Sequence, residues 1–406
     1  MTLSRRSLLK SASTGAALSA ISPGLRAAFA ADASSQRDIL VVIFLRFGCD
    51  GLTMVAPAQD PDYQTHRPNI KVLATGEGAG LPLGMMGGVP FYMHPSAPEL
   101  KALFDAGRLA VVQAVGLPSD TRSHFESQNM MERGVTEGDD PVLGGWLARH
   151  LAARKLELPD LGAVSSAADI HTPLQGIKGV TAIPDVRDFN VPGGDYNLNV
   201  IEILNAAADP HAASARAAVN MIRSVQSSLG RLPPSTGVTY PAGGFASSLR
   251  SLADIIKMNV GLEAATVDFG GWDHHYNMNI YFPPAARHLS QSLKAFWDDI
   301  ASVQHRVTVV TMTEFGRRLE ENTAGGTDHG AASFMFVLGG GVNGGRIYGD
   351  WPGLKPSNLR EGDVRVTTDV RQVLQEILVT RRGEDNLRSI FPTLDYRPRG
   401  ILRAAS

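Results

Sequence analysis

The sequence predicts an α/β fold built on a mostly parallel sheet, and two patterns carry this prediction. Continuous apolar runs rich in β-branched residues recur along the chain, as is typical of strands buried on both faces. Helical patterns stand between these runs, and strands that alternate with helices favour a doubly wound sheet. Hydrophobic residues make up 43% of the 406-residue chain, which is enough for a large core.

The individual elements follow from these patterns in chain order. We expect buried strands at residues 38–47, 109–116, 263–270, 306–315 and 333–341. Helical patterns stand at residues 95–108, 123–134, 244–259, 285–303 and 367–381. The region from about 140 to 250 differs, because its helical patterns at 143–155, 197–208 and 213–229 are separated by Pro and Gly. We interpret this region as a helical insertion or cap.

The first 30 residues have the pattern of a twin-arginine signal peptide. Arg5 and Arg6 are adjacent, Lys10 follows, and a mild apolar run leads to the small-residue cleavage pattern Ala28-Phe29-Ala30. An ordinary secretory signal is the alternative. Either signal predicts a periplasmic or secreted protein, and the paired arginines favour the twin-arginine export machinery as a partner.

Charge and composition exclude several classes of protein. Removing the four basic residues of the leader leaves 34 basic against 40 acidic residues, a net charge of −6, which is not the electrostatic pattern of a nucleic-acid-binding protein. No apolar run after the leader reaches the length of a transmembrane helix. The single cysteine, Cys49, excludes an intrachain disulfide. The fold must therefore depend on core packing.

Polar residues with ligand chemistry gather at the ends of the predicted strands. In doubly wound sheets, ligands bind at the carboxyl ends of the strands. Four stretches follow predicted strands, and a fifth, "GGTDHG", directly precedes one. The candidate residues are Asp50, Thr121 with Ser123, Asp273 with His275, Glu314, and Asp328 with His329.

Each of these residues alone has an ordinary structural explanation. An Asp in a glycine turn is usually part of the turn, Ser123 fits a helix N-cap, and Glu314 has arginine neighbours in sequence. Together, the paired carboxylates and imidazoles suit Zn²⁺ or another transition metal. We therefore expect one or two divalent ions at this edge, beside a hydroxyl that they would make nucleophilic.

The ordered motifs also resemble a known family. The stretches "FLRFGCDGLTMVAP", "TRSHFESQNMMERG", "DFGGWDHH", "TMTEFGRR", "GGTDHG" and "VLGGGVNGGRIYGDWPGL" resemble the bacterial DUF1501 family over residues 38–400. That family is similar to the alkaline phosphatase and sulfatase superfamily. The resemblance implies an alkaline-phosphatase-like three-layer α/β/α sandwich, with residues 31–406 as one domain that carries the helical insertion.

The resemblance also implies roles for particular residues. Ser123 stands where that superfamily has its nucleophile, with Thr121 as the competing hydroxyl. Independently of the resemblance, Arg46 and Arg122 flank the predicted strand-end site, where they are expected to contact an anionic substrate, with ordinary surface pairing as the alternative. The implied metal ligands are Asp50, Asp273, His275, Asp328 and His329.

Two departures from the superfamily patterns bear on the reaction. Many of its metal phosphatases use a further His late in the chain, but no histidine follows His329. Glu314, Asp350, His94 or water would have to complete the site, or it would hold a single ion. The segment "TRSHF" does not match the sulfatase signature. This mismatch favours a phosphatase or phosphodiesterase over a sulfatase.

The sequence thus leads to two functional hypotheses. The first is an exported metal-dependent hydrolase of phosphate or sulfate esters, with a small-molecule or polymer substrate and a Ser nucleophile. The second is a non-catalytic or metal-binding envelope assembly protein on the same fold.

Overall fold

The computed structural model describes residues 37–139, 142–154, 158–206 and 209–403. The predicted signal peptide at residues 1–30 lies outside these ranges. Within them, no helix is both long enough and apolar enough to cross a membrane.

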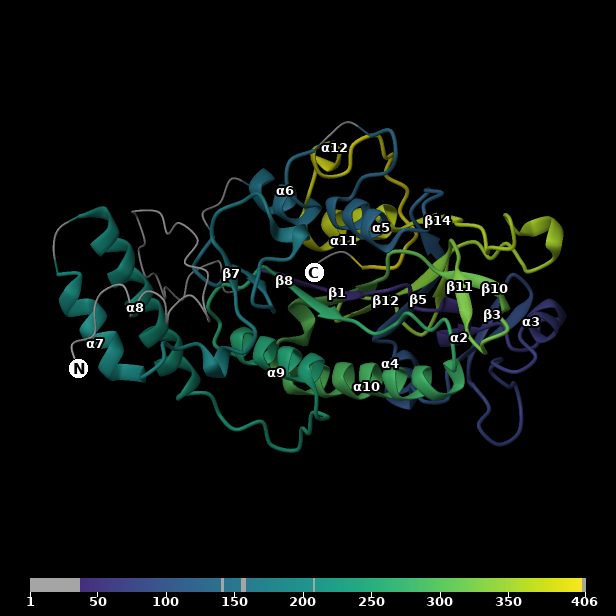
Figure 1. Cartoon of the computed structure of the whole chain (residues 1–406), viewed down its shortest axis with the longest axis horizontal. Helices are drawn as coiled ribbons and strands as arrows, with labels where there is room; N and C mark the ends of the chain where they lie inside the picture. The colour runs from purple at the N-terminus through teal and green to yellow at the C-terminus, as the bar shows by residue number, and fades with distance from the viewer. Residues whose placement is uncertain (1–36, 140–141, 155–157, 207–208, 404–406) are drawn as a thin grey trace.

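A nine-stranded sheet forms the centre of the molecule (Figure 1). Its strands run in the order β13-β5-β12-β9-β1-β8-β6-β7, and β14 also pairs with β5. The bounds are β1 Ile39–Leu45, β5 Leu109–Gly116, β6 Ala163–Ser165, β7 Val180–Ala182, β8 Ala264–Phe269, β9 Val307–Met312, β12 Ser333–Gly339, β13 Ile347–Tyr348 and β14 Thr368–Asp369. All five strands expected from the sequence are present, each within a few residues of its predicted bounds.

Helices cover both faces of this sheet, which gives three layers (Figure 1). On one face lie α4 Pro98–Asp105, α9 Gly244–Lys257 and α10 Met278–Asp299. The other face packs against α5 His124–Arg133, α6 Trp146–Ala153, α11 Val370–Arg382 and α12 Leu387–Ile390. The predicted α/β class, a three-layer sandwich with a mostly parallel sheet, is confirmed.

The central strand β1 shows why the apolar runs form buried strands. All seven of its residues are buried, and successive side chains point to opposite faces of the sheet. Ile39, Val41 and Ile43 belong to the core under α9 and α10, whereas Leu40 and Val42 belong to the core under α11. A strand with helices on both sides must be apolar at every position.

The remaining elements lie around this sandwich. Helices α7 Gly194–Leu204 and α8 Pro210–Leu229 pack on each other and project at the left of the view in Figure 1. Short helices are α2 Gly51–Met54 and α3 Pro61–His66, with 3₁₀ turns at Thr172–Leu174, Val186–Asp188, Ala301–Arg306 and Pro356–Asn358. Two small antiparallel sheets comprise β2 Val55–Ala56, β3 Leu81–Met86 and β4 Val89–Met93, and β10 Arg317–Glu321 and β11 Thr327–His329.

The start of α10 differs from the sequence-based expectation. The helix was expected at 285–303, but it begins at Met278 and contains both Pro283 and Pro284. Proline lacks the N–H that the preceding turn would accept, so a pair of prolines usually marks a helix start. Here the pair stands in the second turn, near the amino end of the helix.

The strand β12 is antiparallel to both of its neighbours, β5 and β9, whereas β1 is parallel to β8 and β9. The amino end of β12 therefore lies at the same edge as the carboxyl ends of β1, β5, β8 and β9. This reversal brings residues that precede β12 to the edge where residues that follow the other strands collect.

A buried ion cluster stabilises the opposite end of β8. Glu263 is almost fully buried and pairs with Arg382 at 2.7 Å, Arg154 at 3.1 Å and Arg37. Burial opposes ionisation of this carboxyl, but the three guanidinium groups outweigh it and hold the pKa of Glu263 below its ordinary value. The carboxylate thus stabilises the fold while it remains ionised.

We predict that Glu263→Gln lowers the free energy of unfolding by about 3 kcal/mol at pH 7, because it breaks a buried charge cluster. Since the folded-state pKa is depressed, the wild-type advantage is fully present above the unfolded-state pKa of about 4.3 and declines as the pH falls further. Denaturant unfolding at several pH values measures both effects. The exposed pair Glu202–Arg223 supplies the control, Glu202→Gln, whose cost should stay below about 1 kcal/mol.

Candidate metal centre

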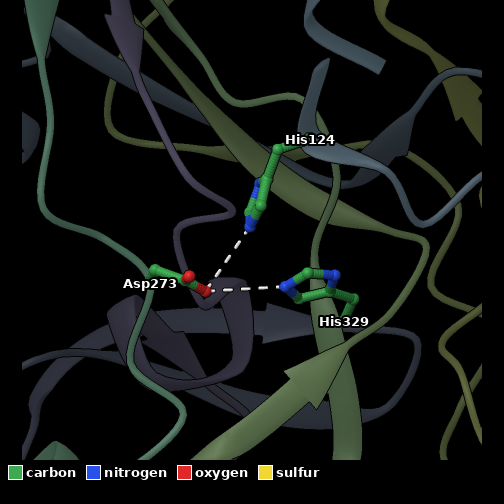
Figure 2. A group of neighbouring side chains, drawn as sticks. All are labelled: His124, Asp273 and His329. Carbon is green, nitrogen blue, oxygen red and sulfur yellow. Dashed lines mark ion pairs between the residues drawn. The ribbon is translucent and has the colours of Figure 1, made fainter. Parts of the chain in front are cut away.

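Three side chains from distant parts of the chain meet at the carboxyl edge of the sheet. His124, Asp273 and His329 each offer one ligand atom, and these atoms lie within 4.8 Å of one another (Figure 2). His124 begins α5 after β5, Asp273 lies in the loop after β8, and His329 ends β11 just before β12. We call this group the His–Asp–His cluster.

His124 is held with one ring nitrogen facing the cluster. Its Nδ1 lies 2.8 Å from Oε1 of Glu314, while its Nε2 lies 3.5 Å from Oδ1 of Asp273. That Nε2 is buried and makes no hydrogen bond to any described residue. Since the carboxylate accepts the Nδ1 proton, the neutral ring has a lone pair at Nε2, which is the tautomer that binds a metal.

His329 is oriented in the same way by a backbone group. Its Nδ1 lies 2.8 Å from the carbonyl oxygen of Arg122, and its Nε2 lies 3.5 Å from Oδ1 of Asp273. A carbonyl oxygen only accepts, so Nδ1 carries the proton and Nε2 is an acceptor, which the Nε2 of His275 approaches to 2.9 Å. Metal-bound histidines characteristically donate their second ring nitrogen to a carboxylate or a carbonyl.

The third imidazole, His275, borders the cluster on its exposed side. Its Nε2 lies 3.0 Å from Oδ1 of Asp273 and 2.9 Å from Nε2 of His329. Its Nδ1 lies 3.3 Å from Oδ1 of Asp328, whose side chain is more than half exposed and also accepts from Asn322. His275 is thus placed to serve as a fourth ligand or to donate a proton near the cluster.

Asp273 is the acidic centre of the cluster. Its Oδ1 accepts a 2.6 Å hydrogen bond from Arg317, which is fully buried. Partial burial of Asp273 favours the neutral acid, but the neighbouring His329 and the Arg317 guanidinium outweigh it and hold the pKa of Asp273 well below its ordinary value. The group is a carboxylate at neutral pH, as a metal ligand must be.

Glu314 lies behind His124 as a buried orienting carboxylate. Its Oε1 accepts from the backbone N–H of Phe47 at 2.8 Å and from the Gln128 amide at 2.8 Å, besides its contact with His124. Burial would raise its pKa, but these hydrogen bonds more than offset that effect and lower the pKa of Glu314. It therefore stays ionised and positions the His124 ring.

Asp50 has different partners from the ones expected of a metal ligand. Its buried carboxylate lies 2.9 Å from the guanidinium of Arg67, which is itself fully buried. It also caps α2 through the N–H of Thr53 and accepts from the hydroxyl of Thr327 at 3.1 Å. These contacts occupy both oxygens of the Asp50 carboxylate. They account for an aspartate at this position without a metal.

The two candidate nucleophiles lie at the start of α5. Ser123 is the N-cap residue, and its hydroxyl oxygen is 3.5 Å from the N–H of Glu126. Thr121 has its hydroxyl 2.6 Å from the Glu126 carboxylate. Ser123 directly precedes His124 in the chain. The N-cap hydroxyl therefore lies on the same segment as one residue of the His–Asp–His cluster.

Beside the cluster lies a polar pocket of about 390 Å³. The guanidinium of Arg122 enters it but pairs with Asp363, which also lies 3.5 Å from Arg318. The lining residues are Asp120, Arg122, His275, Arg318, Asp328, His329, Glu361 and Asp363. Through His275 and His329 the pocket opens directly onto the cluster.

The structure also places residues whose role the sequence reasoning did not assign. Neither His124 nor Arg317 is among the ligands expected from the sequence. Of the alternatives for completing the site, His94 packs on Phe282 and lines a different pocket, and Asp350 pairs with Arg399 at 2.7 Å. His124, rather than either of these residues, meets Asp273 and His329. The position of His124, directly after Ser123 where a strand leads into a helix, was the sequence feature that could have identified it.

The comparisons with solved structures give distant likenesses only. An alkaline phosphatase from the Antarctic bacterium TAB5 shares 11% identity, with 77% of this chain and 95% of that one covered and a TM-score of 0.32. The sulfatase PsFucS1 from Pseudoalteromonas sp. shares 10% identity, with 91% of this chain and 74% of that one covered and a TM-score of 0.35. At these TM-scores neither likeness transfers a function to this chain.

Sequence comparison gives a family match for part of the chain. No curated protein matches the chain. Residues 205–382 match the model of a family described as a protein of unknown function, DUF1501. The resemblance predicted from the ordered motifs is thereby confirmed over residues 205–382, where the chain is similar to the DUF1501 family.

Proposed function

We propose that the protein is an exported metal-dependent hydrolase of phosphate or sulfate esters. The observation that carries this proposal is the pair of oriented histidines, because His124 and His329 both direct Nε2 toward the carboxylate of Asp273, and the Nε2 of His124 has no hydrogen-bond partner among the described residues. A purely structural histidine rarely leaves a buried ring nitrogen without a partner. The twin-arginine leader predicted from the sequence supports the part of the proposal that concerns export.

The donor set fits a divalent transition metal such as Zn²⁺. His124, His329 and Asp273 would hold the ion, with His275 as the fourth candidate ligand. Three protein ligands of this type are the usual set in catalytic zinc sites. Glu314 and the Arg122 carbonyl would act as the orienting groups that such sites require.

A bound divalent ion would supply Lewis-acid chemistry, polarising an ester oxygen and favouring loss of a proton from a nearby hydroxyl or water. The chain itself supplies the surroundings. The adjoining pocket is lined by the guanidinium groups of Arg122 and Arg318 together with four carboxylates, and the two guanidinium groups would be its donors for an anionic ester. Asp363 links them and fixes their positions.

Ser123 is our candidate nucleophile. Its hydroxyl makes only a long contact with the N–H of Glu126, whereas the hydroxyl of Thr121 is close to a carboxylate. Ser123 also stands at a helix N-terminus, where the backbone N–H groups favour a developing negative charge. Small-molecule and polymer esters both remain candidate substrates.

One contact favours the second candidate function, a non-catalytic assembly or binding protein of the cell envelope. Arg317 already neutralises Oδ1 of Asp273, so the cluster is electrostatically balanced by the protein alone. In this case the histidines and Asp273 would be a structural polar network. The experiments that follow separate the two functions.

The first prediction concerns metal content. We expect the mature protein, purified from the periplasm, to contain about one transition-metal ion per chain. His124→Ala and His329→Ala should each lose most of it, because each removes a ligand. Elemental analysis by mass spectrometry measures the content, and His211→Ala, an exposed histidine on α8, serves as the control. Folded wild-type protein that takes up no zinc, cobalt or manganese would contradict the proposal.

The second prediction concerns the orienting carboxylate. Glu314→Gln should weaken metal affinity by about 10–100-fold, because the neutral amide no longer polarises the His124 ring. A competition titration with a chromogenic chelator measures the affinity. Circular dichroism checks that the fold is retained. An unchanged affinity would show that His124 is not a ligand.

The third prediction concerns catalysis. In a panel of aryl phosphates, aryl sulfates and phosphodiesters, we expect at least one substrate whose turnover needs metal and falls more than about 100-fold in Ser123→Ala. Since Ser123 also caps α5, Ser123→Asn is the second variant, which keeps a capping side chain but lacks the hydroxyl. Thr121→Val should retain activity. Bound metal without turnover across the panel would favour the assembly protein.

A further inference from the structure

Phe47 has a backbone conformation that large side chains rarely adopt. Its φ is +81°, in the left-handed region, where a bulky residue is a genuine outlier. Glycine adopts this conformation without steric cost, and it does so at the next residue, Gly48. The presence of phenylalanine here therefore needs a reason other than the shape of the turn.

The candidate metal centre itself holds this backbone in place. The N–H of Phe47 donates to Oε1 of Glu314 at 2.8 Å, and its carbonyl accepts from Arg317 at 2.6 Å. Glu314 orients His124, and Arg317 binds Asp273. The strained residue is thus fixed by the same two groups that position the cluster. Observed strain at such a place is a ground for inferring function.

The ring of Phe47 lies beside the cluster and remains accessible. It meets the His124 ring edge-on, with 5.5 Å between the ring centroids. A second phenylalanine, Phe315, stacks on the His124 ring at 4.8 Å and is buried. Phe47 is instead 36% exposed, which leaves an apolar surface open to a ligand.

We propose that Phe47 is a specificity-determining residue that contacts an apolar or aromatic group of the ester substrate. This inference rests on the proposed function. The polar pocket with Arg122 and Arg318 borders His275 and His329, while Phe47 borders His124. A substrate that places its anionic group among the arginines can therefore extend an apolar group over the Phe47 ring.

The test compares two pairs of non-hydrolysable ligands on the zinc-loaded mature chain. Isothermal titration calorimetry gives the affinities for phenylphosphonate and methylphosphonate, and for benzenesulfonate and methanesulfonate. We expect the wild type to prefer the phenyl member of one pair by about tenfold, as an aromatic contact predicts. Phe47→Gly should reduce this ratio to about one, and Phe47→Asn should do the same.

Both variants keep a residue that tolerates positive φ, so the melting temperature should not fall. The control is Asn259→Gly, a replacement at another residue of positive φ, located before β8 at the opposite edge of the sheet. It should leave the ratio unchanged.

Two outcomes overturn the inference while leaving the proposed function intact. One is equal wild-type affinity for the two members of every pair that binds. The other is a phenyl preference that persists in Phe47→Gly. If the zinc-loaded wild type binds none of the four ligands, the ester hydrolase proposal itself fails, and the role of Phe47 fails with it.

Discussion

The candidate site depends on one buried guanidinium. Arg317 has no exposed side-chain surface, and it donates to the carbonyls of Phe47, Gly48 and Thr327 as well as to the carboxylate of Asp273. A charge in such a place is tolerated only when its donors are paired. The loops after β1 and β8 and the strand β11 are therefore tied to one group. Without it, the residues that face each other across the sheet edge would have no common anchor.

The strands of the sandwich could be predicted from sequence because each is a continuous apolar run between helices. The strand ends then indicated one edge, where the structure brings together Asp273, His275, Asp328 and His329. The antiparallel direction of β12 could not be predicted, since an apolar run carries no information on direction. Had β12 run parallel to its neighbours, His329, which precedes this strand in the chain, would lie at the opposite edge of the sheet. The sequence reasoning placed it correctly without a physical ground for doing so.

Other features depended on tertiary partners that no local pattern reveals. Asp50 looks like a ligand in its glycine-flanked turn, but Arg67, 17 residues away in sequence, pairs with it in the core. His124 looks like an ordinary first-turn residue until Glu314, 190 residues away, is placed behind its ring. Spacing in the chain identifies residues with the right chemistry. Only the fold decides which of them are already paired.

Arg317 is compatible with a metal at the same carboxylate. If an ion takes Oδ1 of Asp273, the guanidinium keeps three backbone carbonyl acceptors, so it does not become an unpaired buried charge. Glu314 behind His124 and Asp328 beside His275 supply negative charge that offsets the added cation. Arg317 thus fixes the cluster before any ion arrives. A centre organised in this way loses little entropy on metal binding, because its ligands are already in place.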